Sequence, residues 1–263
     1  MGDYRFINEG RQHLHTLRGR PLTGVSTVGN VISKPLTWWA AECAAVECLE
    51  HGWHIPTIRS EYEAAVKSGN KSAEIKKIQA RHPEFKAARF AHNVKKEKAA
   101  DEGTDYHACV EGFIKAKIAG TPFTPDPIIA KFVEWSDVEV KRFLFSECHT
   151  YSEPLWIGGI ADFGYLNNKD EFCVGDCKRS GPYAGQYLQV GGYDLALSET
   201  GGFTADGAQL HQPFPPALHH VVCPSKGEYL MLDGRDVEEN RKGFKACLEL
   251  YRTLERINAI IEG

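Results

Sequence analysis

Long apolar runs and targeting signals are missing from this sequence. No stretch approaches the roughly 18 apolar residues that a helix needs to span a bilayer. The opening residues, Met1 to Phe6, contain no apolar segment of a secretory signal, and Phe6 stands where a myristoylation motif requires Ser or Thr. We therefore expect an intracellular, cytoplasmic protein with no membrane partner.

The cysteines lack the spacing of a zinc ribbon or zinc finger. Eight are present, but no two of them form a Cys-x-x-Cys pair, which such sites use to close a tetrahedral centre locally. They are scattered along a chain too long to need a disulfide framework. We expect reduced and mostly buried thiols.

Repeats and low-complexity tracts are absent as well, and the composition is that of an ordinary globular protein. Hydrophobic residues make up 42% and charged residues 25% of the 263 residues, enough for one large domain or for a core with an appendage. The net charge of −4 is unevenly distributed, because the segment Lys67–Lys98 has ten Lys or Arg residues and three acidic ones. Such a basic arm attracts phosphate backbones, although a solvated charged helix gives the same pattern.

The first hundred residues have a mainly helical pattern after an irregular start. Residues 59–81 and 84–98 are rich in Ala, Lys and Glu, which favour helix. His82-Pro83 separates these two predicted helices, because the residue before proline avoids the helical region. A further helix is expected from Gly103-Thr104 to Ala119, with Thr104 as its N-cap.

The pattern then changes to strands, followed by mixed elements. Three strands are predicted at Phe143–Thr150, Leu155–Leu166 and Glu171–Arg179, then a helix, two strands and a last helix at Tyr183–Leu197, His219–Cys223, Tyr229–Leu232 and Asp236–Ile261. The second and third strands form a hairpin, and Gly158-Gly159 in the second suggests a bend or the close approach of another group. This order predicts an α/β fold with a central mixed sheet flanked by helices.

Two carboxylates and an amine converge on the predicted hairpin. Asp176 and Lys178 are two apart on one strand and so project from the same face, and Asp162 on the paired strand comes alongside Asp176. Burying two like charges together is unfavourable unless a cation neutralises them, and Mg²⁺ is the usual cation beside phosphate. His107 on the preceding helix is a candidate nitrogen ligand, which makes Mn²⁺ equally acceptable. Such a site suits phosphodiester hydrolysis, with Lys178 positioned to orient or deprotonate a water or to stabilise charge on the phosphate.

Four motifs in order give the chain a family resemblance. They are Gly103-Thr104-Asp105-Tyr106-His107, Gly158-Gly159-Ile160-Ala161-Asp162, Gly175-Asp176-Cys177-Lys178 and Gln189-x-x-x-Tyr193. Together they resemble the PD-(D/E)XK nuclease superfamily in its RecB-like branch, with its αβββαβ restriction-endonuclease-like core. Residues 24–28 and 34–41 are similar to the start of phage-type and mitochondrial-type exonucleases of this branch. The resemblance implies a nuclease core at 101–263 and a helical N-terminal region at 1–100, which carries the basic arm and packs on that core.

The resemblance also implies a role for each matching residue. Asp162 and Asp176 would bind metal together with the backbone carbonyl of Cys177 and with His107, and Lys178 would be the catalytic lysine. Gln189 and Tyr193, on one helical face, would contact DNA or brace the site. Glu147 is a candidate for a position beside the ligands or for a second metal, against a plain surface glutamate. Glu111 shares a flank with His107, and we favour an ordinary helix carboxylate there.

The chain departs from the family pattern in two places. Ala161 precedes Asp162 where the superfamily name has proline, a departure that RecB-like members often share. Some relatives hold an iron–sulfur cluster through clustered C-terminal cysteines, whereas only Cys223 and Cys247 follow the core here, far apart. We therefore expect Mg²⁺ or Mn²⁺ as the cofactor and no iron–sulfur cluster.

The expected function is a DNA exonuclease acting on single-stranded DNA or DNA ends, with recombination or replication proteins as possible partners. Two alternatives stay open: a structure-selective endonuclease, and a non-catalytic DNA-binding subunit of a recombination or repair assembly. A zinc hydrolase based on His219-His220 is remote, because the two rings would face opposite ways on a strand. Trp38, Trp39 and Trp135 are candidates for base stacking or for core packing.

Overall fold

The computed structural model describes the greater part of the chain, in several stretches. They are residues 4–9, 12–32, 37–50, 59–61, 63–64, 67, 76–78, 80–178, 183–223 and 228–262. The chain divides into two compact units, Met1–Ser33 with Gly103–Gly263, and Lys34–Glu102. Residues 1–33 group with the sheet-containing unit, whereas the sequence pattern places them with the helical segment.

The unit Lys34–Glu102 contains helical segments only, among its described residues. These include α2 (Thr37–Glu50) and the first part of α5 (Pro83–Ala119). The predicted break at His82-Pro83 is confirmed, since α5 begins at Pro83. Much of the basic segment Lys67–Lys98 and the side chains of Trp38 and Trp39 lie outside the described residues.

The predicted helix start at Thr104 is wrong, because α5 runs through this position without interruption. The flanking residues explain the continuity. Residues 99–102 are Ala-Ala-Asp-Glu, and alanine and glutamate are strong helix formers. A single glycine within a helix costs only about 1 kcal/mol relative to alanine, so Gly103 does not end it.

The irregular start expected for the chain is instead a small antiparallel sheet. It consists of β1 (Tyr4–Glu9), β2 (Gln12–Leu17) and β3 (Arg20–Pro21). Leu17 pairs with Arg20, so Arg18 and Gly19 form a two-residue turn, and both have positive φ angles, 52° and 70°. Such primed turns match the twist of a hairpin, and they often contain an Asn-Gly pair, which is missing here.

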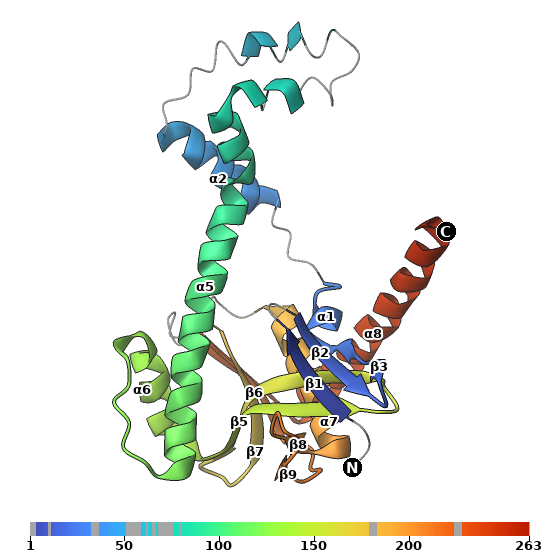
Figure 1. The fold of residues 1–263 in the computed structure, drawn as a ribbon. Coiled ribbons are helices and arrows are strands. Elements are labelled where there is room, and N and C mark those ends of the chain that lie inside the picture. The colour runs from blue at the N-terminus through green and yellow to red at the C-terminus, as the bar shows by residue number, and fades with distance from the viewer. Residues whose placement is uncertain are drawn as a thin grey trace. The chain divides into compact units, whose positions relative to one another are not determined.

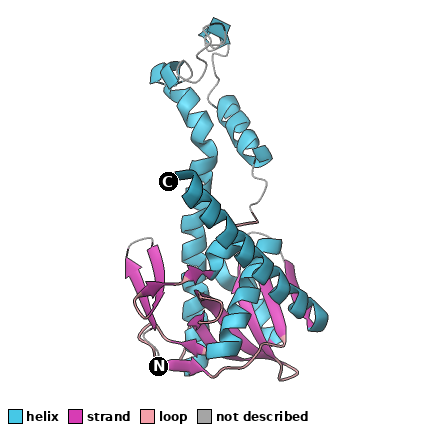
Figure 2. Ribbon diagram, turned by 90° about the vertical axis from the view of Figure 1, so that its right-hand side faces the viewer, coloured by secondary structure: helices cyan, strands magenta, loops and turns pink. Residues whose placement is uncertain are grey.

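The central sheet confirms the predicted mixed α/β architecture. Its strand order is β11-β10-β7-β6-β5-β8-β9, and β4 (Thr23–Gly24) pairs with β6 in addition. The other strands are β5 (Val140–Ser152), β6 (Ile157–Asn167), β7 (Phe172–Cys177), β8 (Gly202–Phe203), β9 (Gln209–His211), β10 (Leu218–Cys223) and β11 (Glu228–Asp233). The pairs β10–β7 and β4–β6 are parallel and the others antiparallel. All described strands lie in the unit that contains the sheet (Figures 1 and 2).

The order of elements after residue 140 follows the prediction closely. After the β6–β7 hairpin come α7 (Ala184–Thr200), the pair β10 and β11, and α8 (Gly234–Glu262). The sequence pattern gave no sign of η1 (Pro127–Ile129), α6 (Ala130–Glu139) or the short strands β8 and β9. None of the described helices is long and apolar enough to cross a bilayer.

Helices cover both faces of the sheet. Along β7, Phe172 and Val174 belong to an apolar cluster with α7 and α8, whereas Cys173 and Cys177 belong to a cluster with α5 and α6. Alternate residues of a strand face opposite sides, so the two clusters lie on opposite faces. Trp135 is buried in the second cluster, which makes it a core residue.

The tandem histidines of β10 are also buried, and their rings face opposite ways as predicted. His219 Nε2 lies 2.7 Å from Asp194 Oδ2 of α7, and His220 Nδ1 lies 2.7 Å from the Tyr165 hydroxyl of β6. Both histidines therefore contribute to the packing of the sheet against its helices.

Candidate metal centre

Strands β6 and β7 bring Asp162 and Asp176 to the same level of the sheet. Phe163 of β6 and Gly175 of β7 are the last residues paired between these antiparallel strands. Asp162 precedes Phe163 and Asp176 follows Gly175, so the two aspartates lie next to this pair at the same end of it. Asp162 Oδ2 accepts the Cys177 N–H at 2.9 Å, which continues the link between the strands through a side chain. The predicted convergence of the two acids on the hairpin is therefore present.

Asp176 and Lys178 form a buried ion pair on one strand face. The Asp176 side chain is 0% exposed, and Lys178 Nζ lies 2.9 Å from its Oδ1. Among the described residues Asp176 Oδ2 is buried without a hydrogen-bond partner. Burial raises the pKa of Asp176, and the nearby charge of Asp162 adds to this, while Lys178 opposes it. Burial lowers the pKa of Lys178, but the two carboxylates outweigh it and leave that pKa raised.

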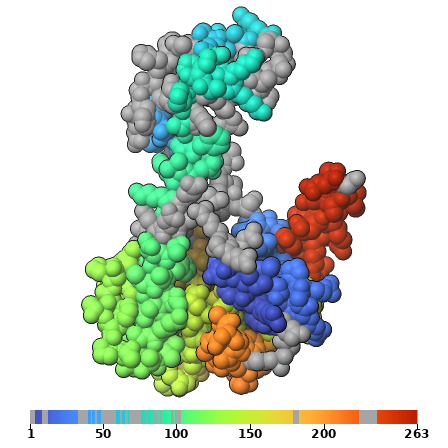
Figure 3. Space-filling model, in the orientation of Figure 1, coloured from blue at the N-terminus to red at the C-terminus, as the bar shows by residue number. Residues whose placement is uncertain are grey.

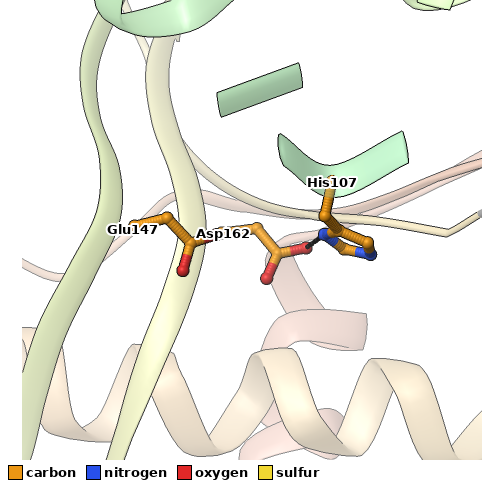
Figure 4. Close-up of side chains that lie close together, drawn as sticks. All are labelled: His107, Glu147 and Asp162. Atoms are coloured by element: carbon orange, nitrogen blue, oxygen red, sulfur yellow. Dashed lines mark ion pairs between the residues drawn. The ribbon is translucent and has the colours of Figure 1, made fainter. Parts of the chain in front are cut away.

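His107 and Glu147 complete a cluster around Asp162 (Figure 4). One potential ligand atom from each of the three lies within 4.8 Å of the others, and His107 Nδ1 is 3.5 Å from Asp162 Oδ2. His107 comes from α5, one turn before Glu111, and Glu147 from β5. Cys148 pairs with Ala161 and Ser146 with Phe163, so Glu147 lies at the level of Asp162.

The backbone and the charge of Glu147 are both unusual. Its φ is 50°, in the left-handed region that non-glycine residues rarely adopt, and such conformations cluster at functional sites. Burial, together with the charges of Asp162 and Glu111, raises its pKa to about 8, although Lys115 and Lys178 act in the opposite direction. A partly buried carboxyl group beside other carboxylates favours the binding of a cation.

Glu111 has another partner on its own helix. Its carboxylate forms an ion pair with Lys115, one turn further along α5. This agrees with the ordinary helix carboxylate that the sequence favoured, although its charge still acts on Glu147. Glu111 is not part of the cluster of potential metal ligands.

Gln189 and Tyr193 approach the carboxylates from α7. Gln189 Nε2 donates to the Tyr193 hydroxyl at 2.6 Å. Burial raises the pKa of Tyr193, and so do the charges of Asp162 and Asp176, while Gln189 and Lys178 lower it. Gly159 makes the approach possible, because a Cβ there would lie 2.7 Å from the Tyr193 ring. The Gly158-Gly159 signal in the sequence thus marks the close approach of another group.

The donor set fits a hard divalent ion. An imidazole nitrogen and two carboxylates are already grouped, and beside Asp162 the buried Asp176 adds an oxygen that has no hydrogen-bond partner among the described residues. Carboxylate oxygens suit Mg²⁺ and Mn²⁺, and one imidazole is compatible with Mn²⁺. The Cys177 carbonyl remains a predicted ligand next to this group. Cys223 and Cys247, at the C-terminal side of the chain, are buried in the α7–α8 cluster.

Sequence reasoning missed what lies beside this centre. Phe6 and His13 of the β1–β2 hairpin line a cavity that also includes Glu147 and His149. Alternation of apolar and polar residues covers only Tyr4, Arg5 and Phe6 here and is missing from Gln12–Leu17, so the sequence offered little signal for these two strands. No known protein family matches the chain, and no curated protein matches it.

Proposed function

We propose that this protein is a divalent-metal-dependent deoxyribonuclease that hydrolyses phosphodiester bonds, with exonuclease action on single-stranded DNA or DNA ends. One observation carries the proposal: two aspartates and a lysine from adjacent positions of a hairpin share a buried site with a histidine and a glutamate. The motif order in the sequence points to the same chemistry.

The residues divide into ion-holding and substrate-facing groups. His107, Glu147 and Asp162 would hold Mg²⁺ or Mn²⁺, with Asp176 and the Cys177 carbonyl as further oxygen donors. A divalent ion bound there lowers the pKa of a water molecule and withdraws charge from a phosphoryl oxygen. The buried and incompletely satisfied Asp176 carboxylate supports this assignment, because a nearby cation would compensate its charge.

Lys178 has its position fixed by the acid that precedes it by two residues. With Nζ held 2.9 Å from Asp176 Oδ1, its remaining protons are available to a phosphate oxygen or to the attacking water. Preorganised donors of this kind stabilise the charge that develops in a transition state. Tyr193, tied to Gln189, lies against the same acids and would keep their side chains in place.

The test is digestion of end-labelled single-stranded and double-stranded DNA with Mg²⁺ and with Mn²⁺, following product lengths over time. An exonuclease releases products progressively from an end and leaves a covalently closed circle intact. Nicking of the circle would favour the endonuclease alternative. Absence of cutting with both ions, while DNA is still bound, would favour the non-catalytic subunit.

A variant pair separates chemistry from general effects of charge. Lys178→Ala should reduce the cleavage rate by at least about 100-fold, the usual result of removing a transition-state donor. Lys169→Ala is the control, because Lys169 is exposed in the turn of the same hairpin and away from the acids. Equal cleavage by both variants would contradict the proposed role of Lys178.

A further inference from the structure

A cavity adjoins the candidate metal centre and shares Glu147 with it. Its volume is about 460 Å³, and its lining includes Phe6, His13, Lys115, Ser146 and His149. The walls come from β1, β2, α5, β5, β6, β9 and the segment that leads from β8 to β9. In Figure 3 the green α5 and the dark blue hairpin stand on either side of the yellow-green strands, with the orange β8–β9 segment nearby.

Glu147 connects the cavity to the metal centre. Its carboxylate belongs to the cluster with His107 and Asp162, and the same side chain lines the cavity. Glu111, Lys115 and Ile118 form the α5 wall, so the positive charge of the Lys115 side chain also lies at this side. A phosphate held at the metal cluster would therefore be separated from the cavity by one side chain, that of Glu147.

The wall formed by the N-terminal hairpin carries aromatic rings. Phe6 and Asn8 project from one face of β1, opposite His15 and His13 of β2. The Phe6 ring lies 4.5 Å from the His149 ring and 5.8 Å from the His13 ring, in the second case with only 9° between the planes. The hairpin packs closely on the sheet, since a Cβ at Gly158 would lie 2.8 Å from His15 Cβ.

Polar groups in the lining are available for a ligand with its own donors and acceptors. His149 is 5% exposed, and within the described part of the chain its Nδ1 is buried without a hydrogen-bond partner. Asn8 and Ser146 line the same cavity, and the Ser146 hydroxyl also lies 3.5 Å from the Asp162 carbonyl oxygen. Apolar rings combined with a few such groups are typical of small-ligand sites, whose volumes run from about 300 to 1000 Å³.

The geometry points to a subsite for a single nucleobase, namely that of the nucleotide beside the scissile phosphate. This inference rests on the proposed nuclease function and adds a substrate contact to it. The cavity receives one base, whose plane contacts the Phe6 and His13 rings while its edge meets Asn8, Ser146 or His149. Because every base has an aromatic face, stacking gives little sequence preference.

The first test needs no variant of the protein. Single-stranded DNA with one abasic nucleotide at successive positions is digested by the full chain, and each cleavage step is timed. Cleavage should slow by about 5- to 150-fold at one position relative to the scissile bond, the range expected from loss of one stacked base. A rate that does not depend on the abasic position overturns the subsite.

The second test assigns the effect to the cavity. Phe6→Ala should slow cleavage of intact DNA to a similar extent and show no further loss on the abasic substrate. Ile7→Ala is the matched control, because Ile7 is the next residue of β1, 38% exposed and outside the cavity lining. Phe6→Leu keeps an apolar side chain without the ring, and it should behave as Phe6→Ala if stacking is responsible.

The outcomes separate the two proposals. Normal cleavage with no abasic position effect, or an abasic effect that persists unchanged in Phe6→Leu, overturns the base subsite and leaves the nuclease proposal standing. No cleavage of any DNA by the unmodified protein overturns the nuclease proposal, and the subsite falls with it. Thermal unfolding of each variant shows whether a lost rate reflects a lost fold.

Discussion

Two aspartates of this protein are equally buried and have opposite electrostatic surroundings. Asp176 and Asp194 are both 0% exposed. Burial by itself raises the pKa of Asp194, but hydrogen bonds from His219 and Arg241 outweigh it and leave the pKa lowered, whereas the pKa of Asp176 is raised despite Lys178. Burial alone therefore does not determine the state of a carboxylate; the number of donors around it does.

The Asp194 site is a closed structural network. Its Oδ2 lies 2.7 Å from His219 Nε2, and its Oδ1 accepts from Ser198 Oγ at 2.8 Å and from Arg241 Nη2 at 3.0 Å. Asn240 Nδ2 lies 2.8 Å from His219 Nδ1, so both ring nitrogens of His219 have a hydrogen-bond partner. These bonds join α7, β10 and α8, so Asp194 holds the fold together, while Asp176 has an oxygen left over for a cation.

The largest effect on stability is expected at the closed network. Asp194→Asn removes the charge that compensates Arg241, and breaking a buried pair typically costs about 3–5 kcal/mol. Because the Arg241 side chain is 20% exposed, we expect the lower end, about 3 kcal/mol, in urea unfolding. Asp170→Asn is the control, since Asp170 is exposed and its φ of 63° suits asparagine. A loss below about 1 kcal/mol would show that the network does not stabilise the fold.

Metal binding at the candidate metal centre should stabilise the fold, and it should not involve the Asp194 network. At a Mg²⁺ or Mn²⁺ concentration 100 times the Kd, the free energy of unfolding should rise by about 2.7 kcal/mol over chelator-treated protein. Asp162→Asn should lose this gain and Asp170→Asn should keep it, as measured by thermal unfolding with titrated metal. An equal gain in both variants would place the ion elsewhere.

The pH dependence of the chelator-treated protein should come partly from Glu147. Its pKa is about 8 when folded, above the ordinary carboxyl value that it has in the unfolded chain. Between these two values only the folded state holds the proton, so stability is greatest at low pH and falls as the pH rises through this window. One such group changes the free energy of unfolding by at most about 1.4 kcal/mol per pH unit.

Glu147→Gln is the variant that isolates this contribution. Urea unfolding of both proteins between pH 5 and pH 8, in roughly unit steps, should show a flatter profile for the glutamine variant. Parallel profiles would mean that Glu147 titrates alike in the folded and unfolded states. Saturating metal should reduce the slope, because a bound cation favours the ionised carboxylate.

The hairpin residues of the site were predictable from the sequence because they depend on local rules. Asp176 and Lys178 share a strand face through the period of two, and a short turn is enough to bring Asp162 beside them. The position of His107 depends on how α5 packs on the sheet, so its residue type and the family resemblance made it a candidate, but no local rule placed it. Local periodicity carries no information on such packing.

The rest of the surroundings could not be predicted because it depends on contacts between distant segments. Phe6 meets His149, and Asp194 meets His219 and Arg241, across long stretches of chain without any shared local pattern. The break expected at Gly103-Thr104 was wrong for a related reason. Packing of Tyr106 and of later apolar residues of α5 outweighs the small helix penalty of one glycine.

The smallest effect is expected from the substitution at Asp176 that matches the one at Asp194. Asp176→Asn removes a charge that is incompletely satisfied, and Lys178 retains the neighbouring Asp162 charge. We therefore expect the free energy of unfolding without metal to rise by about 1 kcal/mol, the equivalent of less than one pKa unit, while cleavage is lost. Stability lost to the same extent as in Asp194→Asn would mean that Asp176 is a structural residue like Asp194, and the contrast between the two sites would disappear. A gain in stability with loss of cleavage is the pattern of a group kept for function at the expense of the fold.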